Sequence, residues 1–556
     1  MSKVDTATAG VSAKTVYEAF CQTAAQWPDN PFLCVMPETA QHYDIPAGEI
    51  TYQSALNKID ALKLAYRNAG YGHGHRVGLL LENRPAFFQH WFALNALGVS
   101  VVPINADMRA AELTYLIGHS EICLAVALPQ RHASLADAAQ QASRRLALIG
   151  PDDDIPRANG AAPLHGREIN TQTECGLLYT SGTTGRPKGC ILPNEYYLHC
   201  GHWYATVGGM ATLHAGKERM LTPLPLVHMN AMACSTLAMV TTGGCLIVLD
   251  RFHPRSWWDT VRESKATVIH YLGVMPAILM KAEPSAQDTR HNVRFGFGAG
   301  IDRSLHEPFE KRFGFPLLEA WAMTETGSGA VVIANHEPRH IGTSCFGREQ
   351  PEVQVKLVND AGQDASVDEH AELLVRHSGP NPRYGFFAGY LKDEAATQQA
   401  WADGWFHTGD VVRRDADGYL HFIDRKKNVI RRSGENIAAV EVEAVLLQHP
   451  AVKAAAVAAV PDPVRGDEVL ACIVTAEGID TDTAATREHT AHDIVNWALS
   501  QLAYYKVPGY VAFVSALPLT ATNKIQRGEL KKMAPTLPET PECVNTCHMK
   551  KRQEPA

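Results

Sequence analysis

A run of ten residues, TSGTTGRPKG at positions 180–189, constrains the fold and chemistry of this chain more than any other feature. It directly follows the apolar residues 177–179, which are typical of the end of a buried strand. Its glycines allow the backbone to curl so that several N–H groups point at one anion, and its hydroxyls and Lys188 add donors and positive charge. The segment therefore predicts a strand that ends in a polyphosphate-binding loop.

The loop differs from two widespread nucleotide-binding motifs. A Walker A loop ends in Gly-Lys followed by Ser or Thr, whereas here Pro187 precedes Lys188 and Gly189 follows it. No dinucleotide fingerprint of the form G-x-G-x-x-G lies between a predicted strand and a predicted helix. The segment therefore predicts a phosphate-binding loop that belongs to neither of these two motifs.

The first third of the chain alternates helix and strand patterns. Apolar residues recur at helical spacing over 56–66 and stop before Gly70, and a strand is predicted at 76–81. Asn83 is expected to cap the next helix, with Pro85 in its first turn. Further strands are predicted at 99–104, 267–272 and 294–297. Short strand–helix–strand connections predict an α/β fold with a mostly parallel sheet packed between helices.

The length of the chain, 556 residues, requires more than one domain, because single cores stop growing near ~250–300 residues. The polar, basic segment 424–436 precedes a compact α+β pattern. We expect a large N-terminal domain of mixed and parallel sheets at 1–423, a hinge at 424–427, a small mobile α+β domain at 428–533 and a flexible tail at 534–556. In the small domain, helices are predicted near 441–448 and 493–504, and strands near 453–460 and 468–475.

Charge and apolar runs narrow the choice of partners. A net charge of -8 gives no basic field for nucleic acid. The N-terminus has no signal-like apolar run. Residues 220–249 lack Asp, Glu, Lys and Arg, but Pro223, Pro225, Asn230 and the pair at 243–244 interrupt them. A buried helix followed by a buried strand is therefore expected there, and not a membrane span.

The twelve cysteines are scattered and lack the density of a disulfide scaffold. We expect reduced thiols in a cytoplasmic protein. Cys543, Cys547 and His548 lie close together in the sequence, but a metal cluster would need a fourth ligand, so free thiols are favoured.

The loop at 180–189 resembles the phosphate-binding signature of the adenylate-forming superfamily, which includes acyl-CoA synthetases, adenylation domains of peptide synthetases and firefly-type luciferases. The resemblance extends over about residues 15–532, because further motifs recur in the order and spacing of the family. It implies that ATP phosphates are bound by Thr180, Ser181, Gly182, Thr183, Thr184, Gly185 and Lys188.

Two segments resemble the family's nucleotide and metal motifs. In WAMTETG at 321–327, the resemblance implies that Glu325 binds Mg²⁺ and that Thr324 contacts the α-phosphate. Trp321 stands where the family usually has tyrosine and is expected to stack on adenine. The turn formed by Gly298, Ala299 and Gly300 is similar to the one that packs along the nucleotide and the acyl pocket.

Further motifs imply how the ribose is held and how the small domain moves. WFHTGD at 405–410 resembles the ribose motif, with Asp410 accepting both ribose hydroxyls and Arg425 as a second ribose or phosphate contact. Lys427 matches the hinge position of the family. The segment of Ser433, Gly434 and Glu435 is expected to swing in for thioester formation, and Gly434 would let a pantetheine arm pass close to the backbone.

The C-terminal segment PLTATNKIQR at 518–527 resembles the family's lysine motif and makes Lys524 the expected catalytic lysine. Asn523 stands where the family usually has glycine, and Asn tolerates left-handed backbone. No side-chain nucleophile is expected in this chemistry.

The acyl pocket is expected to be lined by Trp203, Tyr204, His228, Met229, Gly298 and Gly300. PLPLVHMN at 223–230 resembles the segment that ends on a gating residue, here His228, although a buried His bonded to backbone is the competing interpretation. Trp203 and Tyr204 would suit a quaternary ammonium by cation–π contact, but core aromatics are the favoured interpretation.

The resemblance implies ATP-dependent activation of a small or medium carboxylic acid to an acyl-adenylate, with release of pyrophosphate. No carrier domain follows the lysine motif, so we expect a stand-alone ligase that uses coenzyme A. The chain is most similar to the crotonobetaine/carnitine-CoA ligase branch, through residues 102–105, 322–325 and 432–436. The alternatives are an enzyme that loads a carrier-protein phosphopantetheine and a non-catalytic nucleotide-binding relative. A non-catalytic relative should lack Lys524 or Glu325. The acid and the oligomeric state stay unpredicted.

Overall fold

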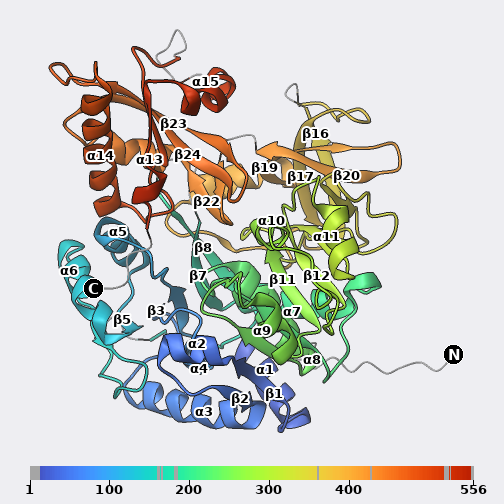
Figure 1. Cartoon of the computed structure of the whole chain (residues 1–556). Coiled ribbons are helices and arrows are strands. Elements are labelled where there is room, and N and C mark those ends of the chain that lie inside the picture. The colour runs from blue at the N-terminus through green and yellow to red at the C-terminus, as the bar shows by residue number, and fades with distance from the viewer. Residues whose placement is uncertain are drawn as a thin grey trace.

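The computed structural model describes residues 13–159, 163–164, 167–180, 186–359, 362–425, 429–518, 525 and 527–551. In this part of the chain three sheets form a large N-terminal domain, and a fourth forms a smaller C-terminal domain, drawn in orange to red in Figure 1. The predicted architecture, mixed sheets with helices and a second α+β domain, is confirmed.

The first sheet has eight strands and is parallel at its centre. Short antiparallel strands form both of its edges. In spatial order its strands are β14 (Val332–Ile333), β13 (Leu317–Trp321), β12 (Phe295–Ala299), β11 (Val268–Leu272), β9 (Arg219–Thr222), β10 (Cys245–Val248), β1 (Pro31–Val35) and β2 (Gly48–Thr51).

The second sheet has seven strands, and its parallel part continues into an antiparallel hairpin. Its strands are β18 (Gly389–Tyr390), β8 (Lys188–Pro193), β7 (Glu174–Thr180), β4 (Ser100–Pro103), β3 (Arg76–Leu80), β5 (Leu124–Ala127) and β6 (Ala147–Ile149). The third sheet is antiparallel, with β15 (Cys345–Arg348), β20 (Tyr419–Arg425), β19 (Phe406–Arg414), β17 (Ala371–His377) and β16 (Val353–Val358).

Helices cover both faces of the first two sheets. Successive residues of a strand point to opposite faces, and here both sets are apolar, so each face needs a covering layer. Leu79 and Val101 pack in the apolar cluster between the two sheets, whereas Leu80 and Val102 pack in the cluster on the outer face of the second sheet. The inner cluster includes α1 (Val16–Gln26), α3 (Tyr52–Asn68), α4 (Pro85–Asn95), α7 (Asn194–Thr206) and α8 (Thr236–Thr242). The outer layers are α5 (Ala110–Ser120) and α6 (His132–Gln141) on the second sheet, and α9 (Trp257–Glu263), α10 (Val274–Leu279) and α11 (His306–Phe313) on the first.

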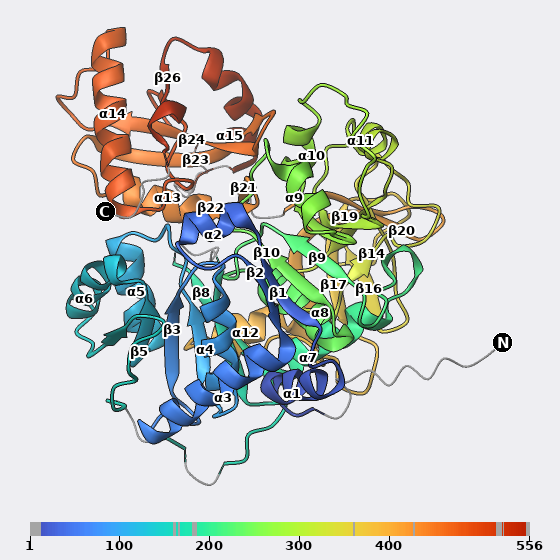
Figure 2. The same cartoon turned by 60° about the horizontal axis from the view of Figure 1, so that its bottom comes forward.

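The small domain has its own core. Its strands are β22 (Glu435–Ala438), β21 (Val429–Arg432), β24 (Gly466–Thr475), β25 (Tyr510–Phe513), β26 (Cys543–Asn545) and β23 (Val452–Asp462). One face packs on α13 (Ala439–Leu446) and α14 (Ala484–Gln501), and the other on α15 (Arg527–Met533). In both views β22 lies on the side of this domain that faces the large one (Figures 1 and 2).

The strands expected at 76–81, 99–104, 267–272 and 294–297 correspond to β3, β4, β11 and β12. Asn83 does not cap α4 through its side chain: its Nδ2 donates to the carbonyls of Leu224 and Leu249, and Arg84 occupies the cap position. The region 220–249 contains β9 before the expected helix and strand. Helix α14 begins at Ala484, nine residues before the expected 493, because Thr483 caps it.

Residues 534–551 do not form the flexible tail that their composition predicts. Strand β26 pairs antiparallel with β25, and Val544 packs against the core of the small domain. Lys550 is fully buried and forms an ion pair with Glu468. The sequence pattern does not predict the pairing of β26 with β25, because a strand of three residues is too short to show a detectable period.

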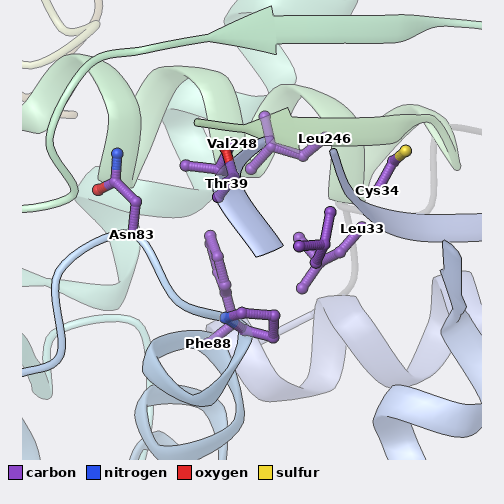
Figure 3. A pocket seen from close by; sticks show the side chains of 9 residues that line it. Leu33, Cys34, Thr39, Asn83, Phe88, Leu246 and Val248 are labelled. Carbon is purple, nitrogen blue, oxygen red and sulfur yellow. The ribbon is translucent and has the colours of Figure 1, made fainter. Parts of the chain in front are cut away.

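The chain passes between the domains where the hinge is expected. Strand β20 ends at Arg425 and β21 begins at Val429, so Lys427 lies outside the described residues. No helix in the described ranges is long and apolar enough to cross a membrane. A cavity of about 10 Å³ lies between β1, β10 and α4, and Figure 3 shows the side chains that line it. The nine residues that line it, all of them described, include none of the predicted site residues.

Candidate active site

Strands β7 and β8, which flank the predicted phosphate loop in the sequence, pair as an antiparallel hairpin. Thr180, the last residue of β7, pairs in register with Lys188, the first of β8. Ser181, Gly182, Thr183, Thr184 and Gly185 lie outside the described residues. Lys188 Nζ lies 4.6 Å from the ring centre of Tyr390 and 3.7 Å from Asp393 Oδ2. The described ends of the loop therefore place a cation beside a tyrosine and a carboxylate.

Glu325, the expected magnesium ligand, contacts the same tyrosine as Lys188. Tyr390 Oη donates to Glu325 Oε1 at 3.0 Å, and Glu325 is only 7% exposed. Burial and the Glu325 carboxylate raise the pKa of Tyr390 well above its usual value, so the hydroxyl keeps its proton and remains a donor. A buried carboxylate oxygen beside a phosphate loop suits Mg²⁺, a hard cation that prefers oxygen ligands.

Helix α7 supports the segment that carries Thr324 and Glu325 from behind. Tyr196 Oη donates to the carbonyl of Thr324 at 2.9 Å. One turn further, His199 Nδ1 and Ser328 Oγ share a hydrogen bond of 2.5 Å. Burial lowers the pKa of His199 to about 3, so the ring is neutral at physiological pH. These contacts fix the backbone of the segment that is predicted to bind the metal.

Trp321 and Asp410, the predicted adenine and ribose residues, touch directly. Trp321 ends β13, and its Nε1 donates to Asp410 Oδ2 at 2.8 Å. Asp410 lies on β19 and is 1% exposed. Its backbone pairs in register with Arg425 on β20. Trp321 therefore orients the carboxylate in addition to any contact that its ring makes with adenine, because indole supplies an N–H donor.

The glycine turn at the end of β12 approaches its neighbours closely. A Cβ at Gly298 would overlap the carbonyl oxygen of Tyr271, and Gly300 adopts a φ of 80°, which favours glycine. Glu319 Oε2 accepts the N–H of Gly300 at 2.9 Å, and Ala299 ends the strand. Burial raises the pKa of Glu319. Sequence reasoning missed Glu319, which holds the turn from the adjacent strand.

The residues predicted for the acyl pocket surround a buried polar network. Tyr204 Oη and His270 Nε2 lie 3.0 Å apart, and His270 Nδ1 lies 2.9 Å from Ser235 Oγ and 2.7 Å from Asn230 Oδ1. Burial lowers the pKa of His270 to about 3. Phe297 packs against both Tyr204 and Trp203, and Met229 packs at the edge of the same cluster. Tyr204 has no exposed surface, in agreement with its favoured interpretation as a core aromatic.

His228 and Glu435 meet across the two domains. His228 Nε2 lies 3.4 Å from both carboxylate oxygens of Glu435, the first residue of β22. Burial lowers the pKa of His228, but the Glu435 carboxylate outweighs this effect and the pKa is raised above its usual value. The His228 side chain is 42% exposed, so it lies at an opening and not in the core.

The β21–β22 turn inserts toward the carboxyl end of β11. Ser433 and Gly434 adopt φ values of 51° and 87°. A Cβ at Gly434 would overlap the side chain of Leu272, the last residue of β11. The turn predicted to act in thioester formation thus lies against the edge of the sheet that carries the glycine turn of β12. Lys524 lies outside the described residues, next to Ile525 and α15.

The cysteines are free thiols, all twelve of them described, in agreement with the sequence prediction. Cys547 Sγ donates to the carbonyl of Gly509, and the ring of His548 packs edge-on against His492. Within the described residues, Cys543, Cys547 and His548 do not form a group with metal-ligand spacing.

A strand hairpin around a segment rich in glycine and hydroxyls, a buried carboxylate bonded to Tyr390 and a second buried carboxylate held by Trp321 are the features expected of a two-domain nucleotide-binding enzyme. The chain belongs to the AMP-binding enzyme family: residues 20–391 match the AMP-binding enzyme model, and residues 441–524 match the AMP-binding enzyme C-terminal domain. It is an AMP-forming acid–thiol ligase that activates a carboxylic acid as an acyl-adenylate.

Similar proteins are ligases of the same kind. Sulfoacetate–CoA ligase from Cupriavidus necator is 31% identical over 91% of this chain and 95% of its own length. Crotonobetaine/carnitine–CoA ligase from Escherichia coli is 28% identical over 86% of this chain and 93% of its own. These two relatives confirm the resemblance predicted from the motifs.

Two solved structures of one synthetase, with different bound ligands, show the same fold. o-Succinylbenzoate CoA synthetase from Bacillus subtilis, a double mutant bound with the product analogue OSB-NCoA, aligns with a TM-score of 0.78 at 23% identity over 92% of this chain and 98% of that one. The same synthetase in complex with the acyl-adenylate OSB-AMP aligns with a TM-score of 0.62 at 23% identity over 92% and 97%.

Proposed function

We propose that this enzyme joins a small or medium carboxylic acid to coenzyme A, in two steps that share one site. In the first, the acid attacks the α-phosphate of ATP and pyrophosphate leaves. In the second, the thiol of coenzyme A displaces AMP. Both curated relatives are named as CoA ligases, which supports coenzyme A as the acceptor.

The first step joins two anions, so its rate depends on positive charge and donors at the phosphates. Glu325 would hold Mg²⁺, which supplies charge against the phosphate oxygens. The loop at 180–189 and Lys524 would add fixed donors, and loss of one such donor typically costs ~10²–10³ in rate. Asp410, held by Trp321 Nε1, would fix the ribose and hence the position of the α-phosphate.

One observation supports the second step most directly: the β21–β22 turn of the small domain is docked against the large domain, with Glu435 on His228 and Gly434 on Leu272. A glycine at this point leaves room for the narrow pantetheine arm. The arrangement also aligns better with the synthetase bound to a CoA product analogue than with the one bound to an acyl-adenylate, with TM-scores of 0.78 and 0.62. Lys524 would then act in the first step only, before the domain rotates.

An acyl pocket at the predicted residues would favour an acid with a compact tail. Trp203 and Phe297 form an aromatic wall, and the imidazole of His270 is neutral and already bonded to Tyr204, Ser235 and Asn230. His228, at the opening, would gate the acid. The free state of the thiols fits our proposal that the enzyme works in the cytoplasm, where thiols stay reduced.

The test is a panel of acids with ATP and Mg²⁺, followed by pyrophosphate release. The panel includes sulfoacetate, crotonobetaine, carnitine and neutral short-chain acids. We expect pyrophosphate with at least one acid, and AMP with acyl-CoA once coenzyme A is added. Transfer of the acyl group to a phosphopantetheine carrier protein but not to coenzyme A would contradict the assignment of coenzyme A as the acceptor. Binding of ATP without turnover of any acid would favour the non-catalytic alternative.

A further inference from the structure

Two histidines and a glutamate from distant parts of the chain meet on the side of α7 that faces the third sheet. His199 lies on α7, Glu352 directly precedes β16, and His377 ends β17. One ligating atom from each residue lies within 4.8 Å of the others. Among the described residues, no second group of three His, Cys, Asp or Glu side chains is arranged in this way. The three side chains offer two imidazoles and one carboxylate.

His199 presents a buried nitrogen to the other two side chains. Its Nδ1 is engaged with Ser328 Oγ at 2.5 Å, and its side chain is 3% exposed. The Glu352 Oε2 atom lies 4.0 Å from His199 Nε2, too far for a hydrogen bond. His199 Nε2 therefore faces the Glu352 carboxylate without a hydrogen bond to it and can offer its lone pair to an ion.

His377 and Glu352 are less tightly held than His199. The His377 ring packs edge-on against His199, with centres 5.9 Å apart, and its Nδ1 accepts the Gly379 N–H at 2.9 Å. Ser378 and Pro380 on either side of Gly379 are exposed, so this N–H can turn to water when an ion takes the lone pair. The Glu352 side chain is 56% exposed and free to swing inward.

The distances fit an ion after a small closure. In a tetrahedral site with bonds of about 2.0–2.2 Å, ligand atoms lie about 3.3–3.5 Å apart. Movement of Glu352 and His377 by about 1 Å reaches this spacing from a present separation of up to 4.8 Å. The exposed side of Glu352 leaves the remaining position of the ion to water.

We propose that His199 Nε2, His377 and Glu352 bind a divalent transition-metal ion of the Zn²⁺ type. Two imidazoles with one carboxylate favour such ions over Mg²⁺ and Ca²⁺, which prefer oxygen ligands. The bound ion joins α7 to β16 and β17. Because Ser328 bonds the other nitrogen of His199, the ion also stiffens the segment that carries Thr324 and Glu325.

The test is titration of the metal-free full chain with Zn²⁺ alone, by calorimetry and by competition with a chromophoric chelator. The comparison is between the wild type and the variants Glu352→Ala and His377→Ala. We expect each variant to bind one Zn²⁺ at least about tenfold more weakly, since even outer contacts of a metal ligand are worth 10–100-fold. Zn²⁺ should also raise the melting temperature of the wild type and not that of the variants.

Two control variants separate this site from other metal-binding groups. The double variant Cys543→Ser/Cys547→Ser removes two thiols, and Glu325→Gln removes the proposed magnesium ligand. Both should keep the Zn²⁺ site. Because His199 is buried, His199→Ala is checked for folding by circular dichroism, and the decision rests on Glu352, which is exposed, and His377, which is half-buried. Equal stoichiometry and affinity in the wild type and His377→Ala, or loss of Zn²⁺ in the cysteine variant alone, would overturn the proposal.

Discussion

Lys506 Nζ of the small domain lies 2.7 Å from Glu112 Oε1 of the large domain, and both side chains are buried, at 8% and 7% exposure. Glu441, in the small domain, accepts from the same Nζ at 2.8 Å. The N–H of Ala503 also donates to Glu112, at 3.0 Å. Burial disfavours the charged lysine, but the two carboxylates outweigh it and raise the pKa of Lys506, so it stays protonated.

Glu112→Gln is expected to weaken this docking without disturbing α5. The amide still accepts the N–H of Arg109 at the start of the helix, and Lys506 keeps Glu441. A hydrogen bond to a charged group is worth ~1.5–3 kcal/mol, so the docked arrangement should be about tenfold or more less populated. Transfer of a pre-formed acyl-adenylate to coenzyme A should slow by that factor, while pyrophosphate release should not change. Single-turnover assays of the two steps measure this.

Lys58→Met is the matched control, because it removes an exposed ion pair with Asp152. The side chains of Lys58 and Asp152 are 47% and 80% exposed. Such pairs contribute little, so neither step should change. Equal slowing of both steps in Glu112→Gln would show that the pair supports the fold as a whole and not the docked arrangement.

Lys524→Ala is expected to separate the two steps in the opposite direction. The proposed role of Lys524 is to face the charge that develops at the α-phosphate, and loss of one fixed donor costs ~10²–10³ in rate. Pyrophosphate release should fall by this factor, while transfer from pre-formed acyl-adenylate should survive. Lys532→Ala, which removes a 75% exposed lysine of α15, is the control and should leave both steps intact. A comparable loss in transfer would contradict an assignment of Lys524 to the first step.

The sequence predicts those parts of the fold and site that depend on local pattern. Strand β11 and the glycine turn after β12 follow from apolar runs that end in small residues, and the family motifs place Glu325, Asp410 and Lys524 in order. These features can be predicted from the sequence because each depends on a short continuous segment.

Contacts between distant segments are not readable in this way. Tyr390 reaches Glu325 only because the two-residue edge strand β18 pairs with β8, and so short a strand has no detectable period. The pair of Glu112 and Lys506 joins residues 394 positions apart. In isolation each charged residue is typical of a solvated surface. Such contacts depend on topology, which local pattern does not fix.

The contact between His228 and Glu435 predicts a pH dependence of docking. The pKa of His228 is raised from 6.5, so its contribution is complete below pH 6.5 and is lost as pH rises through the raised value. Burial raises the pKa of Glu435, but His228 and Lys506 outweigh it, so the pKa is lowered from 4.5. The contribution of Glu435 is complete above pH 4.5 and is lost as pH falls through the lowered pKa. The contact is therefore strongest between about pH 4.5 and 6.5.

The measurement is the ratio of the transfer rates of wild type and Glu435→Gln from pH 5.5 to 9. The ratio cancels the ionisation of the coenzyme A thiol, which affects both proteins. We expect it to fall as pH rises above neutrality. The corresponding ratio for pyrophosphate release is the control and should stay constant. A transfer ratio that does not change with pH would refute a docking role for this pair.

Trp321→Phe is expected to weaken ATP binding through Asp410. The substitution keeps an aromatic ring for adenine but removes the Nε1 donor, which lies 2.8 Å from Asp410 Oδ2. Weaker support of a buried carboxylate costs ~1–3 kcal/mol, so KM for ATP should rise about tenfold while KM for the acid stays unchanged. Trp497→Phe is the control, because it also removes an indole donor, to the carbonyl of Val445 in the small domain, and should not change KM for ATP. Isothermal titration with ATP checks the same effect without turnover. Unchanged ATP affinity in Trp321→Phe would mean that the ring alone, and not its N–H, serves the nucleotide.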